Sequence, residues 1–215
     1  MLGYDLSRPP EAGHGARVAV LLHGRGSHRG ELQALRGRLP DDLVLVTPQA
    51  PFPGHPWGYG PGWAWYRHIE ADRVDDDSLQ RSLQALGVFL SELPALLRLR
   101  PGPIFLGGFS QGGTVSLAYA LSRPGSVAGV LDFSGFLADT PVVAVTPASA
   151  DGAPIFWAHG LRDATVPFYL AQRGRARLEE CGADVTARDY DTGHWIAQRA
   201  LNDVVEFIDA VAPLR

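Results

Sequence analysis

Short apolar runs alternate along the chain with longer segments in which apolar residues recur every three or four positions. The runs are rich in Val, Ile, Leu and Phe and show little polar alternation, which is typical of strands buried on both faces of a parallel sheet. The pattern therefore predicts six strands, at residues 17–22, 43–47, 104–109, 127–133, 155–159 and 185–190.

The segments between these strands show the period of amphipathic helices. One apolar stripe is formed by leucines at positions 79, 83, 86, 90, 93 and 97. The Asp residues at 75–77 favour a helix N-terminus before this stripe, and Pro94 is expected to kink or end the helix. Further helices are predicted at residues 114–122, at 168–181 with Gly182 as the C′ residue, and around Leu201, Val204, Val205 and Ile208.

Alternating strands and helices predict an α/β fold, with a mostly parallel central sheet and helices on both faces, in three layers. The length of 215 residues indicates a single domain over residues 1–215. In such a fold, functional residues gather where strands end and helices begin. Candidate chemistry is therefore expected just after each strand.

Composition and charge narrow the classes of function. Hydrophobic residues make up 46% of the chain and charged residues 20%, which is ordinary for a globular protein. With a formal net charge of −4, the chain has no excess of basic residues for binding nucleic acid, so no nucleic-acid partner is expected. The one cysteine, Cys181, excludes a disulfide framework within the chain. The apolar runs are too short for a membrane span and the N-terminus does not resemble a signal peptide, so a cytoplasmic protein is expected.

No cofactor or metal is predicted. The chain has no H-E-x-x-H pair, no Cys/His cluster with ligand spacing and no P-loop. Gly24 and Gly26 do not form a G-x-G-x-x-G pattern either.

The segment at residues 51–68, PFPGHPWGYGPGWAWYRH, fits neither the strand pattern nor the helix pattern. Long irregular loops in compact domains are usually functional or disordered, and disordered segments are poor in aromatic residues. Two interpretations stay open: an ordered pocket wall, or a structural loop whose Trp residues cover the edge of the core.

The sequence around Ser110 carries the strongest chemical signal. Residues 108–112 read Gly-Phe-Ser-Gln-Gly, a G-x-S-x-G motif between a predicted strand and a predicted helix. This context is that of a nucleophile elbow, a sharp turn that holds the serine in a strained backbone conformation. We therefore predict that Ser110 is a nucleophile.

A serine hydroxyl needs a general base, and in this type of site the acid and the base follow the serine in the chain. Only two histidines lie downstream of Ser110. His194 lies in a loop between the last strand and the last helix, so it is the predicted base. His159 ends a strand and is expected to be partly buried, with a hydrogen-bonding role.

The acid that orients the imidazole is predicted to be Asp163. It follows a strand, and a loop there can extend over the sheet edge toward His194. Asp132, near the end of another strand, is the runner-up. Asp189 and Asp191 are interpreted as a strand-end residue and a loop residue.

The developing oxyanion needs two backbone N–H donors, which are assigned to Gln111 and Arg25. Gly24 and Gly26 permit a turn with exposed backbone around Arg25, and His23 is expected to fix the loop by hydrogen bonds. Because the donor is a backbone group, Gln111→Ala is expected to keep most activity. The Arg25 side chain could meet an anionic substrate group, although a solvated side chain is the favoured interpretation.

Six motifs together resemble a known family: LLHGRG, TPQAP, a Trp-Tyr pair, GFSQGG, HGLRDATVP and GHW. They look like the bacterial phospholipase/carboxylesterase family of the α/β-hydrolase fold, which includes the acyl-protein thioesterases and small carboxylesterases. The resemblance runs roughly from Val18 to Ile208. It implies Ser110, Asp163 and His194 as catalytic triad and the backbones of Arg25 and Gln111 as oxyanion hole.

Two motifs depart from the family pattern. HGRG stands where the thioesterases usually have an HGLGD-like sequence, so the Asp after that turn is missing. GWAWYRH replaces an SWFDI- or SWYDI-like segment, so the acidic residue after the aromatic pair is also absent. Acyl-chain preference is therefore not carried over from the resemblance.

The expected function is hydrolysis of small to medium carboxylic esters by a serine carboxylesterase, with a small-molecule ester as the partner. An acyl thioesterase or lysophospholipase with the same triad, and a non-catalytic ligand-binding module, are the alternatives; a dienelactone-type hydrolase would usually carry a Cys nucleophile. A homodimer is a further hypothesis. Aromatic residues expected to line the substrate pocket are Phe52, Trp57, Trp65, Tyr66, Phe136 and Phe168.

Overall fold

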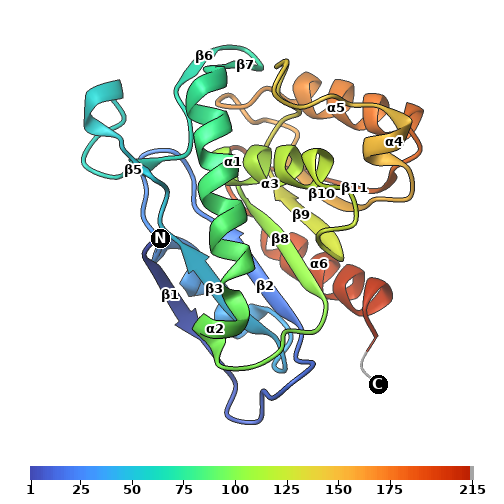
Figure 1. Ribbon diagram of the computed structural model, residues 1–215. Coiled ribbons are helices and arrows are strands. Elements are labelled where there is room, and N and C mark those ends of the chain that lie inside the picture. Colours follow the sequence, from blue (N-terminus) through green and yellow to red (C-terminus); the bar gives the residue numbers. More distant parts are fainter. Residues whose placement is uncertain (214–215) are drawn as a thin grey trace.

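A seven-stranded sheet forms the centre of the computed structural model, which describes residues 1–213 (Figure 1). The last two residues of the domain predicted over 1–215 lie outside the described part. Only β1 runs antiparallel, beside β3, which confirms the predicted mostly parallel sheet. The strands in spatial order are β1 (Tyr4–Ser7), β3 (Val44–Pro48), β2 (Val18–Leu22), β8 (Ile104–Phe109), β9 (Gly129–Phe133), β10 (Pro154–Gly160) and β11 (Asp184–Tyr190).

Helices cover both faces of this sheet (Figure 1). On one face lie α1 (Asp76–Ser91), α2 (Leu93–Leu97), α3 (Gln111–Ser122), α4 (Pro147–Ala150) and α5 (Phe168–Glu180). On the other face lie the 3₁₀ helix η1 (Glu31–Arg38) and α6 (Gln198–Val211). No helix within residues 1–213 is both long and apolar enough to cross a membrane.

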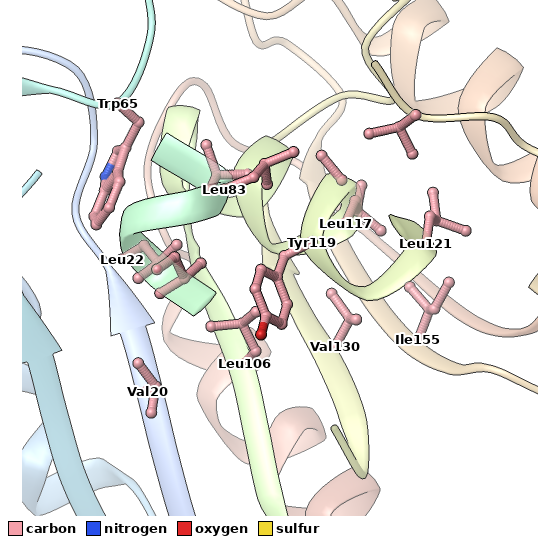
Figure 2. Packing of buried hydrophobic residues seen from close by; sticks show 14 of the residues in the cluster. Val20, Leu22, Trp65, Leu83, Leu106, Leu117, Tyr119, Leu121, Val130 and Ile155 are labelled. Atoms are coloured by element: carbon pink, nitrogen blue, oxygen red, sulfur yellow. The ribbon is translucent and has the colours of Figure 1, made fainter. Parts of the chain in front are cut away.

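Strand β2 shows why the buried runs lack polar alternation. All five of its residues are buried, and neighbouring side chains enter opposite halves of the core. Val20 and Leu22 belong to the same buried cluster as Leu83 and Leu117 of the helices on one face (Figure 2). Ala19 and Leu21 pack on the other face, toward α6. Both sides of the strand must therefore be apolar.

The leucine stripe is divided between two helices. Asp75 caps α1 by accepting a hydrogen bond from the backbone N–H of Ser78, as the acidic run predicted. Glu92 is both the C-cap of α1 and the N-cap of α2, and Pro94 lies in the first turn of α2, where its missing N–H costs no intrahelical bond. The expected break at Pro94 therefore starts a new helix. Gly182 has φ 88° after α5, which fits the predicted C′ residue.

The segment at residues 51–68 is ordered and folds against the loop after β2. It contains the strands β4 (Phe52–Pro53) and β5 (Trp63–Ala64) and the turn η2 (His55–Trp57). The Gly26 N–H donates to the Trp63 carbonyl at 2.8 Å, and the Trp63 N–H donates to the Ser27 carbonyl at 2.7 Å. A Cβ on Gly62 would overlap the Gly26 carbonyl, so only glycine permits this approach. A second hairpin, β6 (His68–Glu70) with β7 (Arg73–Val74), follows.

Candidate active site

Ser110 occupies a strained turn between β8 and α3. Its φ is 54° and its ψ is −114°, a backbone conformation that non-glycine residues rarely adopt. The flanking glycines make the turn sterically feasible, because a Cβ on Gly108 or Gly112 would overlap the Leu22 carbonyl oxygen of the adjacent strand. The side chain is therefore presented at the carboxyl end of the sheet, where the strand–turn–helix pattern placed it.

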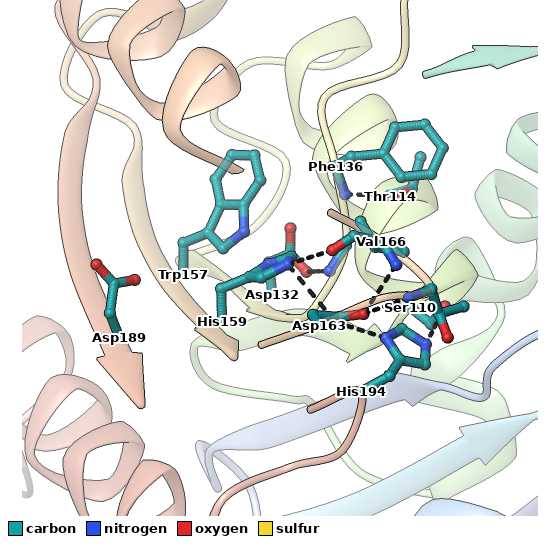
Figure 3. Close-up of polar contacts among 12 residues, drawn as sticks. Ser110, Thr114, Asp132, Phe136, Trp157, His159, Asp163, Val166, Asp189 and His194 are labelled. Carbon is teal, nitrogen blue, oxygen red and sulfur yellow. Dashed lines mark hydrogen bonds and ion pairs between the residues drawn. The ribbon is translucent and has the colours of Figure 1, made fainter. Parts of the chain in front are cut away.

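The structure brings Ser110, His194 and Asp163 together in one hydrogen-bonded chain (Figure 3). His194 Nε2 lies 3.0 Å from Ser110 Oγ, and His194 Nδ1 lies 2.7 Å from Asp163 Oδ2. Asp163 follows β10 and is buried, and its Oδ1 accepts the backbone N–H groups of Thr165 and Val166 at 2.9 and 2.8 Å. These two donors fix the carboxylate so that its other oxygen faces the imidazole.

The other sequence candidates have different partners. His159 Nε2 donates to the Val166 carbonyl at 2.9 Å and lies 3.6 Å from Asp163 Oδ2 (Figure 3). Burial lowers the pKa of His159, so the ring is neutral and braces the turn that carries Asp163. Asp189 pairs with Arg175 at 2.6 Å. Asp191 pairs with Arg162 at 3.0 Å.

Asp132, the runner-up acid, is fully buried at the end of β9. Its Oδ1 accepts the Gly135 N–H at 2.7 Å, and its Oδ2 has no hydrogen-bond partner within residues 1–213. Burial raises the pKa of Asp132 to about 8. It makes no hydrogen bond to His194 and is a neutral carboxylic acid below that pH.

The raised pKa of Asp132 should make the free energy of unfolding depend on pH. Its pKa is about 8 in the folded protein and about 3.9 in an unfolded chain. Between pH 5 and pH 8 the folded protein thus keeps a proton that the unfolded chain has released. The free energy of unfolding should fall as pH rises through this window, by up to about 1.4 kcal/mol per pH unit.

Asp132→Asn should remove this slope, because the amide does not titrate. Urea unfolding at pH 5.5, 6.5 and 7.5 measures the difference in unfolding free energy between wild type and variant. The buried histidines are common to both proteins, so their opposite pH dependence cancels in this difference. A difference that stays constant with pH would contradict a protonated Asp132.

The loop after β2 is held by hydrogen bonds around His23. Its Nδ1–H donates to the Gly24 carbonyl at 2.8 Å, and its Nε2 accepts the Ala50 N–H at 3.1 Å. Burial lowers the pKa of His23, which keeps Nε2 free to accept. Trp65 Nε1 donates to the His23 carbonyl at 3.0 Å. His23 thus fixes the loop that carries Arg25.

The two predicted oxyanion donors both belong to residues that border Ser110. Arg25 and Gln111 line the cavity beside the serine. Within residues 1–213, neither backbone N–H donates to a protein acceptor. Both groups are therefore available to a substrate oxygen.

The Gln111 side chain holds the backbone at Trp65 and Tyr66 in place, a role that the sequence did not predict. Its Oε1 accepts the Trp65 N–H at 3.0 Å, and its Nε2 donates to the Tyr66 carbonyl at 2.7 Å. Alanine would leave both backbone groups without these partners in the interior. The structure therefore argues against the tolerance expected for Gln111→Ala.

A cavity of about 140 Å³ lies beside Ser110. It is smaller than the roughly 300–1,000 Å³ typical of sites for drug-sized ligands. Two of the expected wall residues, Tyr66 and Phe136, line it, with their rings 6.5 Å apart at 86°. The rest of the lining is Arg25, His68, Ala71, Ser110, Gln111, Thr165, Val166 and Leu170.

The other four expected wall residues do not line this cavity. Phe52 and Trp57 pack on each other, with ring centroids 5.0 Å apart. Trp65 is fully buried under the loop after β2. Phe168 packs on His159 with centroids 6.0 Å apart. The 51–68 segment is thus a cavity wall at Tyr66 and His68 and a cover for the core at Trp65.

Comparisons with known proteins show which proteins this chain resembles. A family model described as Phospholipase/Carboxylesterase matches residues 10–212. An acyl-protein thioesterase 1 of Aspergillus fumigatus is 28% identical over 217 residues, which cover 93% of this chain and 89% of that protein. An acyl-protein thioesterase 1 of Cryptococcus neoformans is 30% identical over 185 residues, covering 80% and 77%. The crystal structure of a Bacillus cereus carboxylesterase shares the fold, with TM-score 0.84, 16% identity and coverage of 98% and 95%.

Proposed function

The chain belongs to the phospholipase/carboxylesterase family, and on that basis we propose that it hydrolyses small to medium carboxylic esters through Ser110, His194 and Asp163. The observation that carries this proposal is the continuous hydrogen-bonded chain from Asp163 through His194 to Ser110. A serine in a strained turn with a base at 3.0 Å is the arrangement that nucleophilic catalysis requires.

The proposed reaction has two halves. Ser110 Oγ attacks the ester carbonyl carbon while His194 Nε2 takes the hydroxyl proton, and Asp163 stabilises the resulting imidazolium. The backbone N–H groups of Arg25 and Gln111 hold the tetrahedral oxyanion. His194 then gives its proton to the leaving alcohol, and water repeats the sequence on the acyl-enzyme to release the acid.

Two alternatives differ in what they require of the site. An acyl thioesterase or lysophospholipase would need a long apolar groove, and the cavity of about 140 Å³ favours a short acyl group instead. A non-catalytic ligand-binding module would tolerate a broken triad, and the intact chain of hydrogen bonds argues against it. A cytoplasmic location and a homodimer stay predictions; light scattering that shows a monomer at micromolar concentration would remove the dimer.

Hydrolysis of p-nitrophenyl esters from acetate to palmitate tests the proposed function. We expect kcat/KM to peak between acetate and butyrate and to fall steadily for longer chains, because the cavity beside Ser110 is small. A peak at long chains would favour the thioesterase or lysophospholipase alternative. No turnover of any ester by the wild type would overturn esterase activity and favour the binding module.

A further inference from the structure

The lining of the cavity beside Ser110 contains basic residues and, in the described part of the chain, no acidic ones. Arg25 and His68 line it, and no Asp or Glu does so within residues 1–213. The cavity therefore has the fixed positive charge of an arginine at its lining, beside the reacting serine. A neutral acyl chain would gain nothing from these two side chains.

The exposed Arg25 side chain stacks on one aromatic ring. Its guanidinium carbon lies 4.9 Å from the centroid of the Tyr59 ring, and within residues 1–213 it forms no ion pair with a carboxylate. Stacking on an aromatic ring reduces the conformational freedom of an arginine but leaves the edge N–H groups free to donate. An oriented guanidinium without a carboxylate partner is a suitable receptor for an anion.

His68 also lines this cavity. Its ring packs edge-on against Phe136, with centroids 6.3 Å apart, and its Nε2–H donates to the Ala71 carbonyl at 3.0 Å. Arg25 and His68 come from the two motifs that depart from the thioesterase pattern, HGRG and WYRH. Both departures remove an acid from the sequence, and the structure brings the two segments together at one cavity.

We propose that the cavity beside Ser110 binds esters that carry a free carboxylate, such as half-esters of short dicarboxylic acids, with the carboxylate against Arg25. This inference rests on the proposed function and specifies its substrate class. The positive charge attracts the anion and orients the ester carbonyl over Ser110. The small volume limits the distance between the two groups to a few carbon atoms.

The test compares matched esters at pH 7.5, with acid release followed by pH-stat titration. Monoethyl glutarate and ethyl pentanoate differ by a carboxylate on the acyl side, and 4-acetoxybutanoate and butyl acetate differ by one on the alcohol side. We expect kcat/KM for the anionic ester to exceed that for its neutral partner by about tenfold in at least one pair. The pair that shows the preference identifies the side of the ester bond that enters the cavity.

Substitution of Arg25 assigns the preference to its side chain. Arg25→Met keeps the backbone N–H and the length of the side chain, and it should abolish most of the anionic-to-neutral ratio, whatever the absolute rates. Arg25→Lys should retain part of the ratio. Arg29→Met is the matched control, because Arg29 is in the same loop but pairs with Asp5 at 3.0 Å and does not line the cavity. Raising the salt concentration should also lower the ratio in the wild type.

The outcomes separate this inference from the function on which it rests. Hydrolysis of the neutral esters without preference for either anionic ester would overturn the inference alone. A preference that survives Arg25→Met would overturn it too. Failure to hydrolyse any of the four esters would overturn the proposed esterase activity and this inference with it.

Discussion

Replacing Ser110 with alanine should lower kcat for p-nitrophenyl butyrate by about a million-fold, as in triad knockouts of other serine hydrolases. Ser110 Oγ is the side-chain group that His194 Nε2 contacts, at 3.0 Å. The chain has one cysteine, Cys181, and it is buried after α5, so no thiol is placed to replace the hydroxyl. The residual rate should reflect only the acceleration that the oxyanion hole and substrate binding provide without the nucleophile.

The fold should survive this change. Alanine keeps the Cβ and the backbone strain at position 110, and it removes only the hydroxyl that contacts His194. Thermal unfolding of both proteins checks this. Ser116→Ala is the matched control, because Ser116 is a buried serine of α3, the helix that follows Ser110, and its hydroxyl donates to the Gly112 carbonyl. Its activity should change by no more than a few-fold, and more than 1% residual activity in Ser110→Ala would contradict the assignment of the nucleophile.

The central sheet could be predicted because its strands are buried on both faces. The six expected strands correspond to β2, β3, β8, β9, β10 and β11, with ends that differ by at most two residues. Strand β1 was missed because it is short, antiparallel and half-exposed at the sheet edge, so it has no continuous apolar run. The helix η1 was missed for a related reason, since only Leu32 of its residues is buried.

The placement of Ser110, Asp163 and His194 could also be predicted, because each follows directly from a strand end. The carboxyl ends of parallel strands lie at one edge of the sheet, so residues just after β8, β10 and β11 are expected at the same edge. Asp191 also follows a strand end, and Asp163 is favoured over it because the loop after β10 can extend over the sheet edge toward His194.

The cavity wall could not be predicted in the same way. Trp65 and Tyr66 are adjacent aromatic residues, and nothing in their sequence shows which one faces Ser110. Their orientation depends on hydrogen bonds from the Gln111 side chain, which join segments far apart in the chain. The contact between the Arg25 guanidinium and the Tyr59 ring also joins segments far apart in the chain; Arg25 is exposed, as expected, and it borders the cavity.

Asp163→Asn should lower kcat by about ten-thousand-fold at neutral pH, as the equivalent change does in another serine hydrolase. The hydrogen bonds of the Asp163 carboxylate explain this expected loss. Oδ1 accepts the N–H groups of Thr165 and Val166, so an asparagine must keep its carbonyl oxygen there. Its NH₂ group then faces His194 Nδ1, which becomes an acceptor. The imidazole proton moves to Nε2, and the ring can no longer take a proton from Ser110.

The pH profile of kcat for p-nitrophenyl butyrate, recorded for wild type and variant, measures this effect. Asp191→Asn is the matched control, because Asp191 lies three residues before His194 and pairs with exposed Arg162. It should keep activity within a few-fold of wild type. A loss of less than tenfold in Asp163→Asn would mean that another group sets the tautomer of His194. Asp132 is a poor substitute because it is protonated below about pH 8 and would have no carboxylate to offer the imidazolium.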